Sequence, residues 1–168
     1  MTSALMQIRP FQPSDHSALI ELIAAFRLEL AALRGERRDP DLAAAVAELQ
    51  EYLAKGMPVF VAEGSSKEIV GYLVCRVDGE TVWAESLFVA PTYRRQGTAG
   101  QLYAQAEQLA AARGSDTVYN WVHPNNDPII AFLRKRGYDV LNLLEVRKPV
   151  PDERLTTTLA VGKQTYRY

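Results

Sequence analysis

The residues best suited to chemistry lie in one short stretch, from Leu87 to Gly100. Its sequence, LFVAPTYRRQGTAG, runs from an apolar strand pattern through a turn with two arginines into a helix start rich in small residues. A helix start binds anions well because its first N–H groups are unpaired and the helix dipole is positive there. Arg94 and Arg95 add positive charge. The stretch therefore predicts a pyrophosphate site, and the alternative is that the arginines are solvated and the glycines only permit a tight turn.

Two familiar kinds of nucleotide loop do not match this stretch. It lacks the Gly-x-Gly-x-x-Gly spacing of dinucleotide-binding loops, and the chain contains no Gly-Lys-Ser or Gly-Lys-Thr of the kind that binds nucleoside triphosphates. The pattern disfavours both of these ligand classes.

The elements that must position this loop alternate between strands and helices. Turn signals and hydrophobic periodicity predict an α/β (α+β) fold of one domain over residues 1–168, a mixed sheet flanked by helices on both faces, with 150–168 as a C-terminal strand extension. The predicted strands are 7–9, 58–62, 69–77, 81–89, 117–123 and 138–146, and residues 156–168 form one more strand or a small hairpin. Four helices are predicted. The first follows the cap residues Pro13-Ser14-Asp15 and has apolar residues from Leu19 to Leu33 on one side, and the second begins after an Asp39 cap and stops at Gly56. The other two cover 97–113 and 127–137.

The composition limits which kinds of partner, metal site and cellular compartment we expect for this chain. A length of 168 residues with 48% hydrophobic content suffices for a core without disulfides, and the net charge of −1 favours neither nucleic acid nor a membrane surface as partner. The single Cys75 forms no internal disulfide and builds no multi-thiolate metal site, and a mid-strand cysteine is typical of a core. No leader or apolar span is evident. We expect a cytoplasmic protein without a bound metal.

The loop also resembles a known family. Arg94-x-x-Gly97-x-Ala99, which follows Val89-x-Pro91-x-Tyr93, is similar to the acyl-CoA motif of the Gcn5-related N-acetyltransferases (GNAT). A second match is an Asn ahead of a short helix that ends in Gly-Tyr, here Asn126 and Gly137-Tyr138. The resemblance extends over roughly residues 5 to 147.

The resemblance implies an enzyme that transfers an acetyl group from acetyl-CoA to an amine of a small molecule or peptide by direct attack in a ternary complex. It also implies that the strand before the loop carries a bulge and diverges from the next strand, so that its backbone pairs with the pantetheine arm. Backbone N–H groups of the loop would bind the pyrophosphate, and the N–H of Val89 or Leu87 would support the oxyanion. The implied cosubstrate-binding residues are Leu87, Phe88, Val89, Arg94, Arg95, Gln96, Gly97, Thr98, Ala99, Gly100 and Asn126.

Glu85 is the candidate general base, because a protonated amine must lose a proton before it attacks a thioester. Strand alternation predicts that Trp83, Glu85 and Leu87 share one face, where apolar neighbours would raise the pKa of the Glu85 carboxyl. Related polyamine acetyltransferases also carry a Glu at this place. The alternatives are that Glu85 orients the substrate or is a salt-bridged sheet residue. His123 is the competing base.

One position departs from the family pattern. Many members place a Tyr four residues before the helix-ending glycine, where it protonates the leaving sulfur, and this chain has Leu133. Water or one of three other tyrosines, Tyr103, Tyr119 and Tyr138, would then take this role.

Two readings compete with the enzyme. Leu133 favours a non-catalytic acyl-CoA-binding or regulatory domain, whereas Glu85 favours an enzyme. The strand pattern of the tail favours pairing across a subunit boundary, and we expect a homodimer through this C-terminal strand.

Overall fold

A computed structural model describes residues 6–168. The chain forms two compact units, one that ends at Trp121 and one from Val122 to Tyr168.

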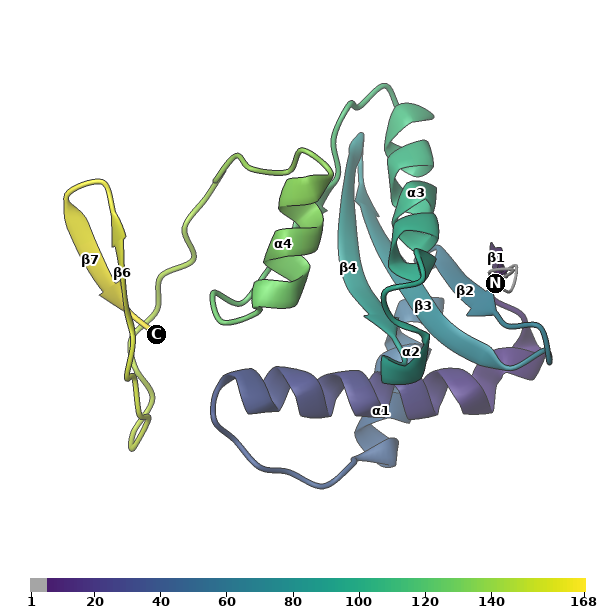
Figure 1. The fold of residues 1–168 in the computed structure, drawn as a ribbon, viewed down its shortest axis with the longest axis horizontal. Helices are drawn as coiled ribbons and strands as arrows, with labels where there is room; N and C mark the ends of the chain where they lie inside the picture. Colours follow the sequence, from purple (N-terminus) through teal and green to yellow (C-terminus); the bar gives the residue numbers. More distant parts are fainter. Residues whose placement is uncertain (1–5) are drawn as a thin grey trace. The chain divides into compact units, whose positions relative to one another are not determined.

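The first unit is built on a five-stranded mixed sheet with the order β1-β2-β3-β4-β5 (Figure 1). The first four strands pair antiparallel with their neighbours, and β5 runs parallel to β4. The predicted mixed sheet is therefore confirmed. The strands are β1 Gln7–Pro10, β2 Val59–Glu63, β3 Ile69–Asp78, β4 Thr81–Val89 and β5 Tyr119–Asn120.

Helices cover both faces of this sheet. One face packs on α1 (His16–Leu33) and α2 (Leu42–Ala54), in a core that joins the apolar sides of both helices to strands β2, β3 and β4. The other face carries α3 (Thr98–Ala111), where Leu102 approaches Gly71 so closely that a Cβ there would lie 3.3 Å from its Cδ1 (Figure 1). A sheet that is apolar on both sides needs a cover on each, and the predicted two-faced arrangement is confirmed.

The cap of α2 differs from the prediction. The Asp41 side chain, not that of Asp39, accepts the N–H of Ala44 at 2.8 Å and so begins the helix at Leu42. An Asp at the N-cap satisfies one of the orphan N–H groups of a helix start, and Asp39 and Asp41 both offered that chemistry. The backbone conformation before the helix decides which of the two aspartates is the N-cap, and the residue types alone do not specify that conformation.

A β-bulge interrupts the β3–β4 hairpin at Glu85, the candidate base. Val74 lies opposite Ser86, but the next pair is Cys75 with Ala84, so that Glu85 is an extra residue on β4. A bulge shifts the alternation of side chains by one position. Trp83 and Leu87 therefore point to opposite faces, and the predicted shared face of Trp83, Glu85 and Leu87 is wrong.

The second unit contains one helix and one hairpin. Helix α4 (Asp127–Lys135) is followed by Gly137 at φ +90°, as its predicted end requires. The tail forms the small hairpin of β6 (Thr158–Val161) and β7 (Gln164–Arg167), as predicted. No helix within residues 6–168 is both long and apolar enough to cross a membrane.

Two predicted strands are wrong or too long. Residues 138–146 contain no strand, and the apolar side chains of this segment are exposed, with Val140 at 86% and Leu143 at 76%. The predicted strand 117–123 is reduced to the two residues of β5. An apolar run indicates a segment that is stabilised when its side chains are buried. A strand also needs a neighbouring strand whose backbone forms hydrogen bonds with it. The periodicity of the sequence does not indicate which segment would be that neighbour.

Candidate active site

The predicted anion loop leads from the end of β4 to the start of α3. A short 3₁₀ turn at Pro91–Tyr93 is followed by two left-handed residues, Arg95 at φ +63° and Gly97 at φ +85°. The first intrahelical bond of α3 runs from the N–H of Gln101 to the carbonyl of Gly97, at 3.1 Å. Among residues 6–168 no side chain caps this helix start, so its first N–H groups remain available to an anion.

A backbone edge of β4 lies beside this loop. The pairing of β4 with β5 ends at Ala84 and Asn120, so β5 does not cover the edge from Glu85 to Val89. The bulge that the family resemblance implied is present, and the pairing of β4 with β5 is limited to two residues on each strand. An uncovered strand edge presents N–H and C=O groups to which an extended ligand adds like another strand. The side chains of Phe88 and Val89 are buried, so this edge offers its backbone.

The two loop arginines have different surroundings. Arg94 Nε donates to the carbonyl oxygen of Val89 at 2.7 Å, and Arg94 Nη2 donates to Glu29 Oε1 at 2.7 Å. Its guanidinium also lies over the ring of Phe88, 5.2 Å from the centroid. Within residues 6–168 the side chain of Arg95 makes no ion pair or hydrogen bond, and it is exposed. Arg94 therefore contacts other groups of the protein, whereas Arg95 faces solvent, and their role toward a phosphate stays a prediction.

Glu85, the candidate base, forms an ion pair within the sheet. Arg76 Nε donates to Glu85 Oε2 at 3.0 Å, and both side chains are about one quarter exposed. The rings of Trp83 and Trp121 flank the Arg76 guanidinium, with their centroids 4.7 and 4.9 Å from its central carbon. The carboxylate therefore lies beside a cation held by two aromatic rings, not among apolar groups alone as expected.

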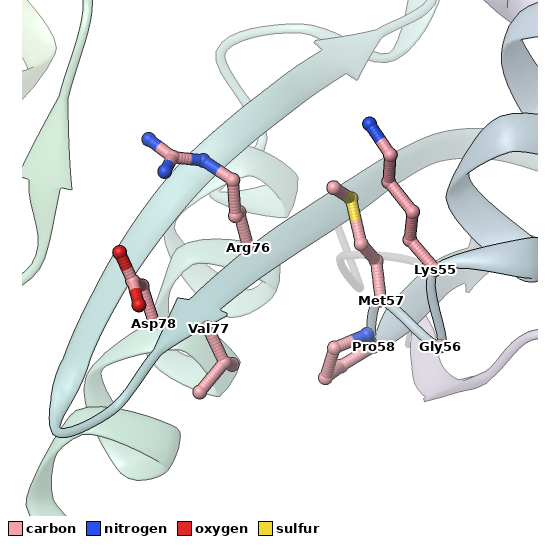
Figure 2. A pocket seen from close by; sticks show the side chains of 7 residues that line it. All are labelled: Lys55, Gly56, Met57, Pro58, Arg76, Val77 and Asp78. Atoms are coloured by element: carbon pink, nitrogen blue, oxygen red, sulfur yellow. The ribbon is translucent and has the colours of Figure 1, made fainter.

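A hollow of about 260 Å³ opens beside Arg76. Figure 2 shows that Arg76, Met57 and Lys55 extend to one side of it, whereas Val77 points the other way, as alternation along β3 requires. Arg76 is the one member of the Arg76–Glu85 ion pair that lines this hollow. Its lining residues are Lys55, Gly56, Met57, Pro58, Arg76, Val77 and Asp78.

The candidate proton donors in the first unit are buried or stacked. Tyr103 is fully buried in α3, and its hydroxyl exchanges hydrogen bonds with the Asn120 amide at 2.8 and 3.0 Å. Tyr119 packs on Trp83, with ring centroids 5.1 Å apart.

Cys75 is fully buried, and desolvation raises the pKa of its thiol to about 12, which leaves it protonated and a poor nucleophile at neutral pH.

The second unit contains the other predicted site residues. Asn126 Oδ1 accepts the N–H of Ile129 at 3.5 Å, so this residue caps α4. His123 Nδ1 accepts the N–H of Asn125 at 3.1 Å. Leu133 is buried in α4, and its carbonyl accepts the N–H of Tyr138 in the helix-ending turn. These contacts give each residue a local structural role.

Arg76 is the site residue that the sequence analysis missed. The Asp78-Gly79 signal predicted the hairpin but not its register. A two-residue turn of Asp78 and Gly79 would set Arg76 opposite Thr81, whereas the turn is formed by Gly79 and Glu80 and sets Arg76 opposite Trp83. The Glu29 contact of Arg94 has no such signal, because the two residues are 65 positions apart.

Comparisons with known proteins agree with this geometry. The model of the acetyltransferase (GNAT) family matches residues 22–138. An acetyltransferase of Pectobacterium atrosepticum is 27% identical over 149 residues, which cover 89% of this chain and 99% of that protein.

Two solved structures share the fold. The aminoglycoside N-acetyltransferase AAC(6')-Iy, in complex with CoA, superposes with a TM-score of 0.65 at 20% identity, over 88% of this chain and 97% of that one. The PaiA N-acetyltransferase of Thermoplasma acidophilum, in complex with coenzyme A, gives a TM-score of 0.66 at 17% identity, over 79% and 88% of the two chains.

Proposed function

This chain belongs to the acetyltransferase (GNAT) family, and we propose that it transfers an acetyl group from acetyl-CoA to an amine of a small molecule or peptide by direct attack in a ternary complex. The observation that carries the proposal is the uncapped start of α3 directly after an uncovered edge of β4. A thioester on a long arm with a pyrophosphate needs both features, an extended backbone for the arm and a helix start for the phosphates.

The cosubstrate would be bound mainly by backbone. Leu87, Phe88 and Val89 would pair with the pantetheine arm, and the N–H groups from Arg95 to Gly100 would bind the pyrophosphate. The left-handed residues Arg95 and Gly97 support this assignment, because consecutive N–H groups in such turns converge on an anion. The exposed Arg95 side chain adds charge without a competing partner among residues 6–168.

The chemistry proposed for Glu85 is removal of a proton from the acceptor ammonium, directly or through a water. The neutral amine then attacks the thioester carbon and the C–N bond forms. The nitrogen gives a second proton to water, the C–S bond breaks, and the electron pair of that bond leaves with the sulfur. The N–H of Val89 or Leu87 would stabilise the oxyanion. A thiol with a pKa of about 8.5 is a tolerable leaving group, so the sulfur can leave as thiolate and take its proton from water.

The ion pair with Arg76 supports Glu85 as the group nearest the acceptor. Arg76, whose guanidinium lies between two tryptophan rings, holds the carboxylate at the bulge in the middle of β4, and Arg76 also lines the hollow. His123 is the alternative base, but its Nδ1 already accepts a backbone N–H. An amine acceptor fits a site with a carboxylate and aromatic rings, since both attract cations.

The second candidate function is a non-catalytic acyl-CoA-binding or regulatory domain. Leu133 favours it, because a buried leucine stands where many family members carry the tyrosine acid. The test is calorimetric titration of the protein with acetyl-CoA and desulfo-CoA, together with thiol release against a panel of amines. Amine-dependent release supports the enzyme, binding without release supports the regulatory domain, and no binding of acetyl-CoA contradicts both.

Two further properties belong to this proposal. The hairpin of β6 and β7 presents strand edges that suit pairing with a second copy, which supports a homodimer through the C-terminal segment. The buried, unpaired thiol of Cys75 supports a reducing, cytoplasmic setting.

A further inference from the structure

Arg94 lies in the acyl-CoA motif, yet its guanidinium contacts the protein on three sides. We infer that Arg94 is a positioning residue, which ties the anion loop to the end of β4 and to helix α1, and that it does not bind phosphate. This inference rests on the proposed function, because the loop it positions is the proposed acyl-CoA site.

The first contact sets the end of β4. Arg94 Nε donates to the carbonyl oxygen of Val89 at 2.7 Å, a short charge-assisted bond to the last residue of the strand. Val89 is one of the two residues, with Leu87, whose N–H is proposed to stabilise the oxyanion. The bond therefore fixes the peptide geometry of the strand end that receives the cosubstrate.

The second and third contacts set the loop against α1. Arg94 Nη2 donates to Glu29 Oε1 at 2.7 Å, and Glu29 lies in α1, on the face of the sheet opposite α3. The guanidinium also lies over the Phe88 ring, which in turn packs on Phe26 of α1 with centroids 5.7 Å apart. One side chain thus connects the loop, the strand and the helix that covers the other face of the sheet.

These contacts engage two of the three guanidinium nitrogens, Nε and Nη2. A guanidinium binds an anion best as a two-pronged donor, and Arg94 already directs Nε and Nη2 at protein oxygens. Arg95 is the matched contrast, because its side chain is exposed and has no ion pair or hydrogen bond within residues 6–168.

The test compares the dissociation constant of CoA for Arg94→Gln, Arg95→Gln, Glu29→Gln and the double variant Glu29→Gln/Arg94→Gln, by calorimetry at low and at high salt. Salt screens a charge that faces a bound phosphate. For a positioning residue we expect Arg94→Gln to weaken CoA binding about two- to tenfold at both salt concentrations. Glu29→Gln should weaken binding in the same direction, and the double variant should lose less than the product of the two single losses. Arg95→Gln should lose affinity mainly at low salt.

The opposite pattern would overturn the inference. If Arg94 binds phosphate, Arg94→Gln loses its affinity at low salt and little at high salt, and Glu29→Gln leaves binding unchanged or tightens it by freeing the arginine. Thermal unfolding of each variant shows that the loop variants are folded. Failure of the unaltered protein to bind CoA overturns the proposed function itself, whereas a CoA-binding protein with the phosphate-ligand pattern overturns only this inference.

Discussion

Arg76 donates from Nε to Glu85 Oε2 at 3.0 Å, from the strand next to the one that carries the candidate base. The contact exists because the bulge at Glu85 leaves this residue without a cross-strand partner of its own, while Arg76 pairs with Trp83. The carboxylate of Glu85 is therefore positioned by its neighbour, with two tryptophan rings holding the guanidinium in place.

Replacement of this carboxylate tests its role as base. We expect Glu85→Gln to lower amine-dependent turnover by about 10²- to 10⁴-fold near neutral pH, which is the usual contribution of a general base. The loss should be smaller at high pH, where more of the amine is already neutral. The measurement is thiol release across the pH range, with CoA affinity as the control that should stay unchanged. Equal turnover of both proteins at every pH would remove Glu85 as the base.

Tyr103 offers a test that separates stability from chemistry. Its buried hydroxyl exchanges hydrogen bonds with Asn120, and Tyr103→Phe would leave that amide without this partner. We expect the free energy of unfolding to fall by about 1–2 kcal/mol, with turnover retained because the hydroxyl is enclosed between α3 and β5. Denaturant unfolding and thiol release measure the two quantities. A variant of full stability that has lost turnover would instead assign Tyr103 as the proton donor.

The carboxyl of Asp15 makes the free energy of unfolding depend on pH. Asp15 is 4% exposed, and hydrogen bonds from Arg9 at 2.7 and 2.9 Å hold the pKa of its carboxyl below the usual value. Because the folded pKa is the lower one, this stabilisation is fully present above the unfolded pKa of about 4 and is lost as the pH falls through the folded pKa.

Asp15→Asn should therefore lower the free energy of unfolding by about 2–3 kcal/mol at pH 7 and flatten its decline below pH ~5. The matched control is Glu51→Gln, which removes an exposed ion pair with Lys55 and should change stability little. Urea unfolding at several pH values measures both. The same pH dependence in Asp15→Asn and the unaltered protein would contradict the prediction.

The homodimer is tested by shortening the chain. A protein that ends after Pro149 lacks β6 and β7, and we expect its sedimentation to change from dimer to monomer because the hairpin supplies the proposed pairing edge. The control is the full chain at the same concentration. An unchanged oligomeric state would rule out the hairpin as the interface.

The sequence by itself determined the local parts of this protein. Helices α1 to α4, strands β1 to β4 and the β6–β7 hairpin follow from apolar periodicity and turn residues, and the anion loop follows from Arg94, Gly97 and the helix behind them. These features depend on residues close together in the chain, where spacing alone sets which side chains share a face. The family itself was evident from the same short motif, and the family match over residues 22–138 confirms it.

The tertiary structure decided what depends on distant partners. The bulge at Glu85 reversed the predicted alternation, and Arg94 forms an ion pair with Glu29, which lies 65 positions away in the sequence. Residues 138–146 form no strand in the described part of the chain, although their apolar composition predicted a strand there. In each case the deciding partner lies on another element, and residue type does not specify which distant group will offer a hydrogen bond or a covering surface.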